Sequence, residues 1–189
     1  FDVETVSSGV VNSNCTSEAN KLYAKVRVTN TGKFSGKEVV QVYIAKPQGK
    51  LGKPAKELAA FEKTRELQPG ESQLMILTWE INDMASYDDL GKVKKSAYVL
   101  EAGSYDIYVG TSVRDVTKAD YSYILNHDVI TEQLSAKLVP TSLPKRMLAD
   151  GSYEALPQSE PVDTDYSAIG NIDPSLTEGV APGQRAIPY

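Results

Sequence analysis

The side chains that most often carry out catalysis are few in this chain, and their spacing does not suggest a reaction. Asp88 and Asp89 are adjacent, and in an extended chain their carboxylates point to opposite sides, so they cannot flank one scissile bond. We interpret them as a solvated turn. The single histidine, His127, has no serine nucleophile at a recognisable spacing and is expected at a strand edge or on the surface. The single cysteine, Cys15, excludes an intramolecular disulfide and a cysteine-based zinc cluster.

Metal and cofactor sites are not expected either. An acidic cluster near the end of the chain suggests calcium; its members are Asp163, Asp165, Asn171 and Asp173. The spacing of an EF-hand loop fails there, because Ala168 occupies the position that requires glycine and Pro174 the position that requires glutamate. No glycine-rich phosphate loop opens a helix. The prediction is therefore no catalytic residue, no metal ligand and no cofactor.

Charge and hydropathy exclude further classes of function. The 189 residues contain 20 Lys and Arg against 25 Asp and Glu, a net charge of -5, which is not the basic footprint of a nucleic-acid binder. No apolar run approaches the length of a membrane span. Phe1 opens the chain without a signal peptide, so we read it as a piece of a larger protein, and one free cysteine slightly favours the cytoplasm.

The elements that would position any site are predicted to be strands. Leu22, Ala24, Val26 and Val28 alternate with polar residues, which is typical of a strand with one apolar face. Further strands are expected at 38–45, 58–67, 73–81, 97–100, 105–109 and 121–125, with one helical turn near Met84. No segment offers an amphipathic helix, so the pattern predicts an all-β sandwich. The expected core contains Val26, Val42, Ile44, Leu74, Ile76, Trp79 and Tyr105.

A short motif predicts how the sandwich is locked. In Gly103-Ser104-Tyr105 the tyrosine stands where a tyrosine corner would stand, its ring in the core and its hydroxyl bonded to upstream backbone. This feature is expected to stabilise the fold and to carry no catalytic role.

Proline and charge divide the chain in two. Seven of the ten prolines lie in residues 140–189, a stretch with 3 basic and 7 acidic residues. We therefore predict a sandwich over 1–130 and an extended, proline-rich acidic tail or interdomain linker over 131–189. In this long irregular tail, residues 137–160 are expected to take an extended course along the sandwich surface, and the rest to Tyr189 to be irregular. The possible anchors are Leu138, Leu143, Met147 and Leu148.

Ordered motifs give the chain a family resemblance. They read VRVTNTG at 26–32, GKEVVQVY at 36–43, KPAKEL at 53–58 with Phe61 after it, LQPGES at 67–72 and GSYDIYVG at 103–110. Over about residues 20–115 the chain resembles the fibronectin type III-like domain of glycoside hydrolase family 3. The resemblance implies an immunoglobulin/fibronectin type III-like β-sandwich of about seven or eight strands.

The resemblance also implies a parent enzyme and a place in it. Family members are retaining β-glucosidase-like enzymes that remove terminal β-linked sugars with two carboxyl groups roughly 5 Å apart. Their nucleophile is typically an Asp before a Trp; here the only Trp, Trp79, follows Thr78, and the Lys-His sugar-binding motif is also missing. The chain alone is therefore expected to be inactive and to brace the catalytic domains of its parent polypeptide. The alternative is a carbohydrate-binding or adhesion module that uses exposed tyrosines such as Tyr23 and Tyr43.

The predicted contact with the catalytic domains is the lysine-rich loop 47–57 and the strand after it. Lys53, Lys56, Glu57 and Phe61 are the expected interface residues, in a loop that should be exposed and mobile in the isolated chain. The acidic tail further suggests a permuted domain order, with a (β/α)8 barrel downstream; the alternative is a partner-binding tail at a natural C-terminus.

Overall fold

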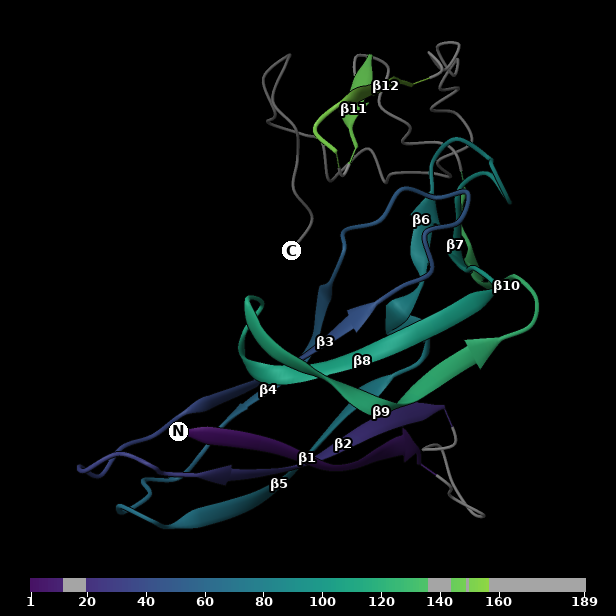
Figure 1. Ribbon diagram of the computed structural model, residues 1–189. Helices are drawn as coiled ribbons and strands as arrows, with labels where there is room; N and C mark the ends of the chain where they lie inside the picture. The colour runs from purple at the N-terminus through teal and green to yellow at the C-terminus, as the bar shows by residue number, and fades with distance from the viewer. Residues whose placement is uncertain (12–19, 136–143, 149, 157–189) are drawn as a thin grey trace, which may run out of the picture.

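Two antiparallel sheets form the body of the molecule in this computed structural model, which describes residues 1–11, 20–135, 144–148 and 150–156 (Figure 1). The first sheet has the order β1-β2-β5 and the second β4-β3-β8-β9. The strands are β1 (Asp2–Val10), β2 (Lys21–Thr29), β3 (Val39–Ala45), β4 (Glu57–Lys63), β5 (Ser72–Glu80), β8 (Gly103–Ser112) and β9 (Asp115–Leu125). The sheets lie face to face, so the predicted fibronectin type III-like sandwich is confirmed.

The core lies between the two sheets because each inner strand is apolar on one side. Leu22, Ala24, Val26 and Val28 of β2 are fully buried, and they meet Val40, Val42 and Ile44 from β3. Burying side chains of this kind stabilises the fold by about 1.5–3 kcal/mol each. The alternation in the sequence therefore predicted this part of the core correctly.

Strand β5 contradicts part of the predicted core. Leu74 and Ile76 are 50% and 60% exposed, whereas Met75, Leu77 and Trp79 fill the interior. The register explains the difference, since Trp79 pairs with Leu22 and Met75 with Val26, and directly opposed residues share a face of the sheet. A strand that is apolar on both faces does not reveal which face is inward until its partner is known.

A third, smaller sheet caps one end of the sandwich. It has the order β10-β7-β6, from β6 (Ser86–Asp88), β7 (Ala97–Leu100) and β10 (Val129–Gln133), so the boundary predicted at residue 130 falls inside β10. A separate small core of Leu51, Ala97 and Val99 lies under it. The predicted helical turn is the 3-10 helix η1 (Asn82–Met84), and no helix in the described ranges is long and apolar enough to span a membrane.

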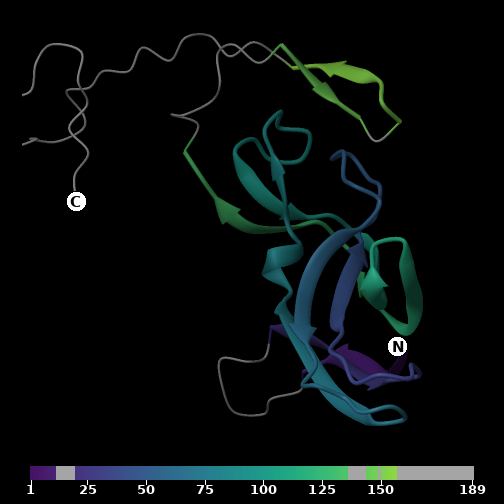
Figure 2. The same cartoon turned by 90° about the vertical axis from the view of Figure 1, so that its left-hand side faces the viewer.

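A two-stranded hairpin lies beyond the sandwich, where irregular chain was expected (Figure 2). Strand β11 (Lys145–Met147) pairs with β12 (Tyr153–Ala155). Arg146 Nη1 lies 3.3 Å from Asp89 Oδ1, and Lys92 Nζ donates to Glu154 Oε1 at 2.5 Å, so ion pairs connect the hairpin to the loop after β6. Leu148 is half-buried near Gly52, but Met147 is 66% exposed and is not an anchor. Leu138 and Leu143 lie outside the described residues.

Candidate interdomain interface

The predicted tyrosine corner is present and organises the loop that was expected to form the interface. The Tyr105 hydroxyl donates to the Glu101 carbonyl oxygen at 2.9 Å, and the ring is buried in the core. Burial of the phenol raises the pKa of Tyr105 well above its usual value, and the nearby Glu101 carboxylate adds to the shift. The same hydrogen bond holds Glu101 in place at the start of the turn before β8.

The Glu101 side chain fastens the loop 47–57 to the sandwich. Its carboxylate accepts the Lys50 and Leu51 backbone N–H groups at 2.5 and 3.2 Å and forms a buried ion pair with Lys53. The Lys53 ammonium also donates to the Pro47 carbonyl oxygen at 2.7 Å. The expectation of an exposed loop is therefore wrong for Lys53, which is 5% exposed and binds its own loop. Sequence reasoning could not find this because Glu101 lies 48 residues away.

The other three predicted interface residues lie on or next to β4. The Lys56 ammonium sits 4.8 Å from the centre of the Tyr108 ring, a cation–π arrangement. Glu57 forms an ion pair with Lys46, whose side chain is almost fully buried. Phe61 is 67% exposed on the outward side of β4, opposite Gln41. Lys56, Glu57 and Phe61 are thus grouped along one edge strand, and Lys53 is buried in the loop that precedes this strand.

Lys56 lies at the border of an aromatic outer face of the second sheet, whereas Glu57 pairs with the core residue Ile44 on the inner side. Leu58 pairs with Tyr43, and Tyr43 with Tyr108, so three apolar side chains form a row across β4, β3 and β8. Phe61 follows next to this row on β4. We call Tyr43, Leu58, Phe61 and Tyr108 the outer face. Tyr43 itself is 9% exposed, so the suggestion that it stacks on sugars as an exposed ring is wrong.

Asp88 was interpreted as part of a solvated turn, but its side chain is fully buried. Its two carboxylate oxygens accept four backbone N–H groups, from Gly91, Lys92, Val93 and Lys94, at 2.6–3.0 Å. Burial disfavours the charged form, but the four hydrogen bonds outweigh it and hold the pKa of Asp88 below its usual value. The carboxylate therefore shapes the loop between β6 and β7 and is not available for catalysis.

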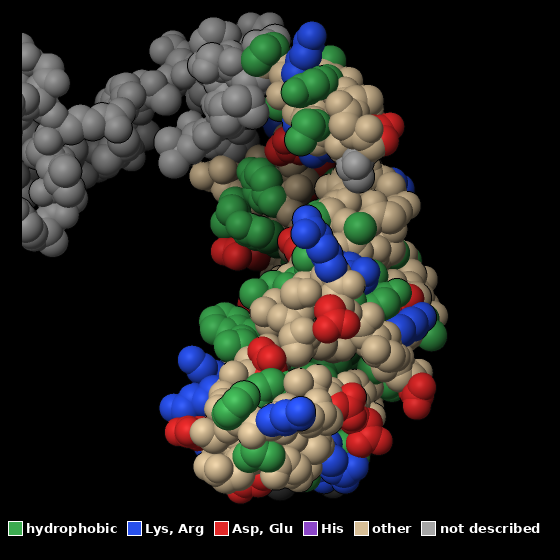
Figure 3. Space-filling model, turned by 60° about the vertical axis from the view of Figure 1, so that its left-hand side comes forward, with side chains coloured by type: hydrophobic (Ala, Val, Ile, Leu, Met, Phe, Trp, Pro, Cys, Tyr) green, Lys and Arg blue, Asp and Glu red, His purple; other side chains and the backbone are tan. Residues whose placement is uncertain are grey.

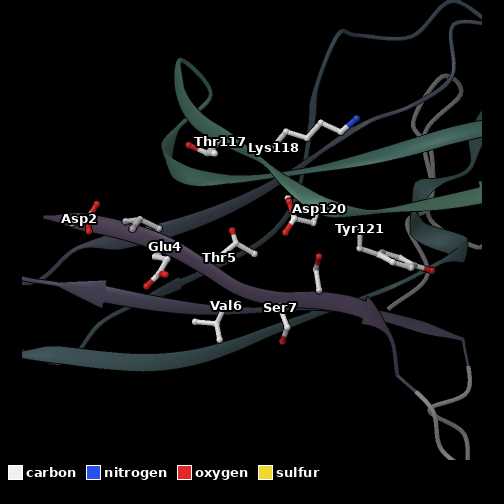
Figure 4. A pocket seen from close by; sticks show the side chains of 12 residues that line it. Asp2, Glu4, Thr5, Val6, Ser7, Thr117, Lys118, Asp120 and Tyr121 are labelled. Atoms are coloured by element: carbon white, nitrogen blue, oxygen red, sulfur yellow. The ribbon is translucent and has the colours of Figure 1, made fainter.

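A polar groove of about 730 Å³ runs between the edge strands β1 and β9 (Figure 4). Asp2, Glu4 and Asp120 contribute carboxylates to its lining. Glu4 points away from β9 and accepts Arg27 Nη1 at 2.8 Å. Lys118 donates to Asp106 at 2.7 Å, a bond that lowers the pKa of that carboxyl. Figure 4 shows Asp2, Glu4 and Asp120 at separate places along the groove, so its carboxylates do not converge on one point as a glycosidase pair must.

The remaining sequence candidates add no reactive group. His127 is exposed, as expected. Within the ranges that the structure describes, no three His, Cys, Asp or Glu side chains gather as metal ligands. Cys15 and the acidic cluster from Asp163 to Asp173 lie outside those ranges. The described part of the chain thus offers a stabilised scaffold with an aromatic face.

Comparison with known proteins agrees with this picture. Residues 38–113 match the family model described as "Fibronectin type III-like domain". The chain is 64% identical to Beta-glucosidase A of Butyrivibrio fibrisolvens, in an alignment that covers 80% of this chain and 18% of that protein. It is 44% identical to a beta-glucosidase of Ruminococcus albus, in an alignment that covers 77% of this chain and 16% of that protein. A solved beta-glucosidase structure from Paenibacillus barengoltzii matches with a TM-score of 0.68 and 41% identity over 84% of this chain and 18% of that one.

The chain spans less than a fifth of the length of these relatives. The matched residues 38–113 contain β3 to β8 and the tyrosine corner. Residues 38–113 therefore belong to the fibronectin type III-like domain family, and the chain is similar to the corresponding part of these family 3 β-glucosidases.

Proposed function

We propose that this chain is a non-catalytic accessory domain that braces the catalytic domains of a family 3 glycoside hydrolase. The parent would be a retaining β-glucosidase-like enzyme that hydrolyses terminal β-linked sugars. The two β-glucosidases compared above are more than four times the length of this chain, which supports a role as one part of such an enzyme. The permuted domain order remains a prediction.

The aromatic outer face is the observation that carries this proposal. Leu58 and Phe61 are 50% and 67% exposed, and they lie on a sheet whose opposite side is the core. Full burial of one large apolar side chain of this kind contributes about 1.5–3 kcal/mol of stabilising free energy. Lys56 at the border can add an ion pair to an acidic partner surface. The loop 47–57, which precedes β4, is fixed to the sandwich by hydrogen bonds from its backbone to the Glu101 carboxylate.

The test compares one residue of the outer face with an equally exposed residue on the other sheet. Phe61→Ser and Ile76→Ser are introduced into the isolated chain and into the full-length parent. In the isolated chain both variants should unfold within about 0.5 kcal/mol of the wild type, because both side chains are exposed. In the parent, Phe61→Ser should lower the thermal midpoint and speed proteolytic separation of the domain, and Ile76→Ser should not. Equal effects of the two variants in the parent would contradict the proposal.

Activity gives a second measurement. The pure chain should not hydrolyse aryl β-glucosides or aryl β-xylosides. Turnover by the chain that disappears when one of its own residues is changed would show that it is catalytic.

A further inference from the structure

The open side of the third sheet carries a row of two tyrosines and a carboxylate. Tyr87 pairs with Tyr98, and Tyr98 with Glu132, so the three side chains cross β6, β7 and β10 in line. The tyrosine ring centres lie 5.4 Å apart with an angle of 56° between the ring planes. Both rings are more than a third exposed. Figure 3 shows hydrophobic side chains gathered at the level of this sheet, with acidic ones close by.

A shallow groove of about 380 Å³ adjoins the Tyr98 ring. Its other lining residues are Asn82, Asp83, Ala85, Thr131 and Glu132. Besides the Tyr98 hydroxyl, the polar side-chain groups of the lining are two carboxylates, one carboxamide and one hydroxyl, and the lining contains no Lys or Arg. The groove therefore offers mainly hydrogen-bond acceptors next to an aromatic ring.

A smaller cavity of about 90 Å³ is lined by Asp83 and Met84 of η1, so it shares Asp83 with the groove. Its lining includes Trp79, the Lys46–Glu57 ion pair and Leu58 of the outer face. Trp79 is 5% exposed, and its Nε1–H meets no acceptor within the described residues. A buried donor without a partner costs about 1–3 kcal/mol, so this group favours a ligand that brings an acceptor.

The polar groups of the two hollows limit the ligand's chemistry. An anion is disfavoured by the carboxylates of Asp83 and Glu132. A cation cannot accept from Trp79 Nε1–H, and the Lys46 ammonium already pairs with Glu57 in the cavity. A hydroxyl group both accepts and donates, and the apolar face of a pyranose ring packs well on an aromatic side chain. The cavity has room for a hydroxyl or hydroxymethyl group, because one water occupies roughly 30 Å³.

We propose that Tyr98, Asp83, Glu132 and Trp79 form a binding site for a neutral carbohydrate around η1. In this site the sugar ring lies on Tyr98, its hydroxyl groups donate to Asp83 and Glu132, and one hydroxyl enters the cavity and accepts from Trp79 Nε1–H. The groove at Tyr98 shares no lining residue with the outer face, whereas the cavity includes Leu58 of that face. Sugar binding by the isolated chain does not depend on the bracing role. Its failure would leave that role intact, and the reverse also holds.

Sugar binding can be followed by NMR at the single tryptophan of the chain. Trp79 is the only Trp of the chain, so its indole N–H gives one signal in a 1H–15N NMR spectrum. The 189-residue chain is titrated with glucose, cellobiose and laminaribiose up to tens of millimolar. At least one sugar should shift the indole signal along a saturable curve. Tyr98→Ala should weaken that sugar's binding about tenfold or more.

Tyr153→Ala serves as the matched control, because this tyrosine is exposed on the hairpin and does not line either hollow. It should bind the sugar as the wild type does. The proposal is overturned if none of the sugars shifts the indole signal, or if Tyr98→Ala and Tyr153→Ala bind equally. It is also overturned if an arginine-rich peptide saturates the site at lower concentration than every sugar, which would indicate a basic protein partner instead.

Discussion

Replacing Tyr105 by Phe removes one oxygen atom and isolates the contribution of the tyrosine corner. The hydroxyl donates to the Glu101 carbonyl oxygen at 2.9 Å in a buried environment, so the variant loses one hydrogen bond and leaves that carbonyl without this donor. A net hydrogen bond contributes about 0.5–1.5 kcal/mol, and an unsatisfied buried group costs about 1–3 kcal/mol. We therefore expect the free energy of unfolding to fall by about 1–2 kcal/mol.

Urea unfolding of the isolated chain measures this loss directly. For a sandwich of this size, 1 kcal/mol corresponds to about 4 °C in the thermal midpoint, so a decrease of about 4–8 °C is expected. Tyr87→Phe is the control, because that side chain is 40% exposed and its change should stay within about 0.5 kcal/mol. If the two variants unfold at the same denaturant concentration, the hydrogen bond of the corner does not stabilise the fold.

Alkaline pH gives an independent check of the same group. Burial raises the pKa of Tyr105, so the native state holds this proton at a pH where the unfolded chain has released it. The stabilisation is complete below about pH 10, the usual pKa of tyrosine, and is lost as pH rises above it. Tyr105→Phe should therefore lose stability less steeply above pH 10 than the wild type, by up to about 1.4 kcal/mol per pH unit. Identical slopes would refute the inferred shift.

Three further changes test the polar interior and the hairpin. Asp88→Asn should destabilise the chain by about 3 kcal/mol or more in urea, because an amide cannot accept all four N–H groups. Since the pKa of Asp88 is lowered, the greater stability of the wild type should be present above about pH 4 and decline below it. A stability difference that does not change with pH would argue against this. Lys53→Met should lower the free energy of unfolding by about 3–5 kcal/mol, because it leaves the Glu101 carboxylate buried without its ion-pair partner. Adding Glu101→Gln to this variant should restore part of that stability. If it restores none, lost packing and not the buried charge causes the effect. Arg146→Gln should leave the global unfolding midpoint within about 0.5 kcal/mol but speed proteolysis between residues 135 and 156, and unchanged cleavage would show that these ion pairs do not hold the hairpin.

Local patterns in the sequence determined the fold class and most of the strands. The alternation from Leu22 to Val28 requires a sheet with one buried face, and Gly103-Ser104-Tyr105 predicts the tyrosine corner, because both depend on neighbours within a few residues. The expected strand 97–100 matches β7. The family resemblance also came from short ordered motifs, and residues 38–113 confirm it.

The tertiary structure alone decided which polar and apolar groups are buried. Leu74 and Ile76 could face either way until β5 paired with β2. Lys53 looked like a surface cation until β8 brought Glu101 beside it. Asp88 looked solvated until the following loop folded its N–H groups around the carboxylate. Each outcome depends on contacts that a local pattern does not encode, because burial and pairing are properties of segments brought together only when the chain folds.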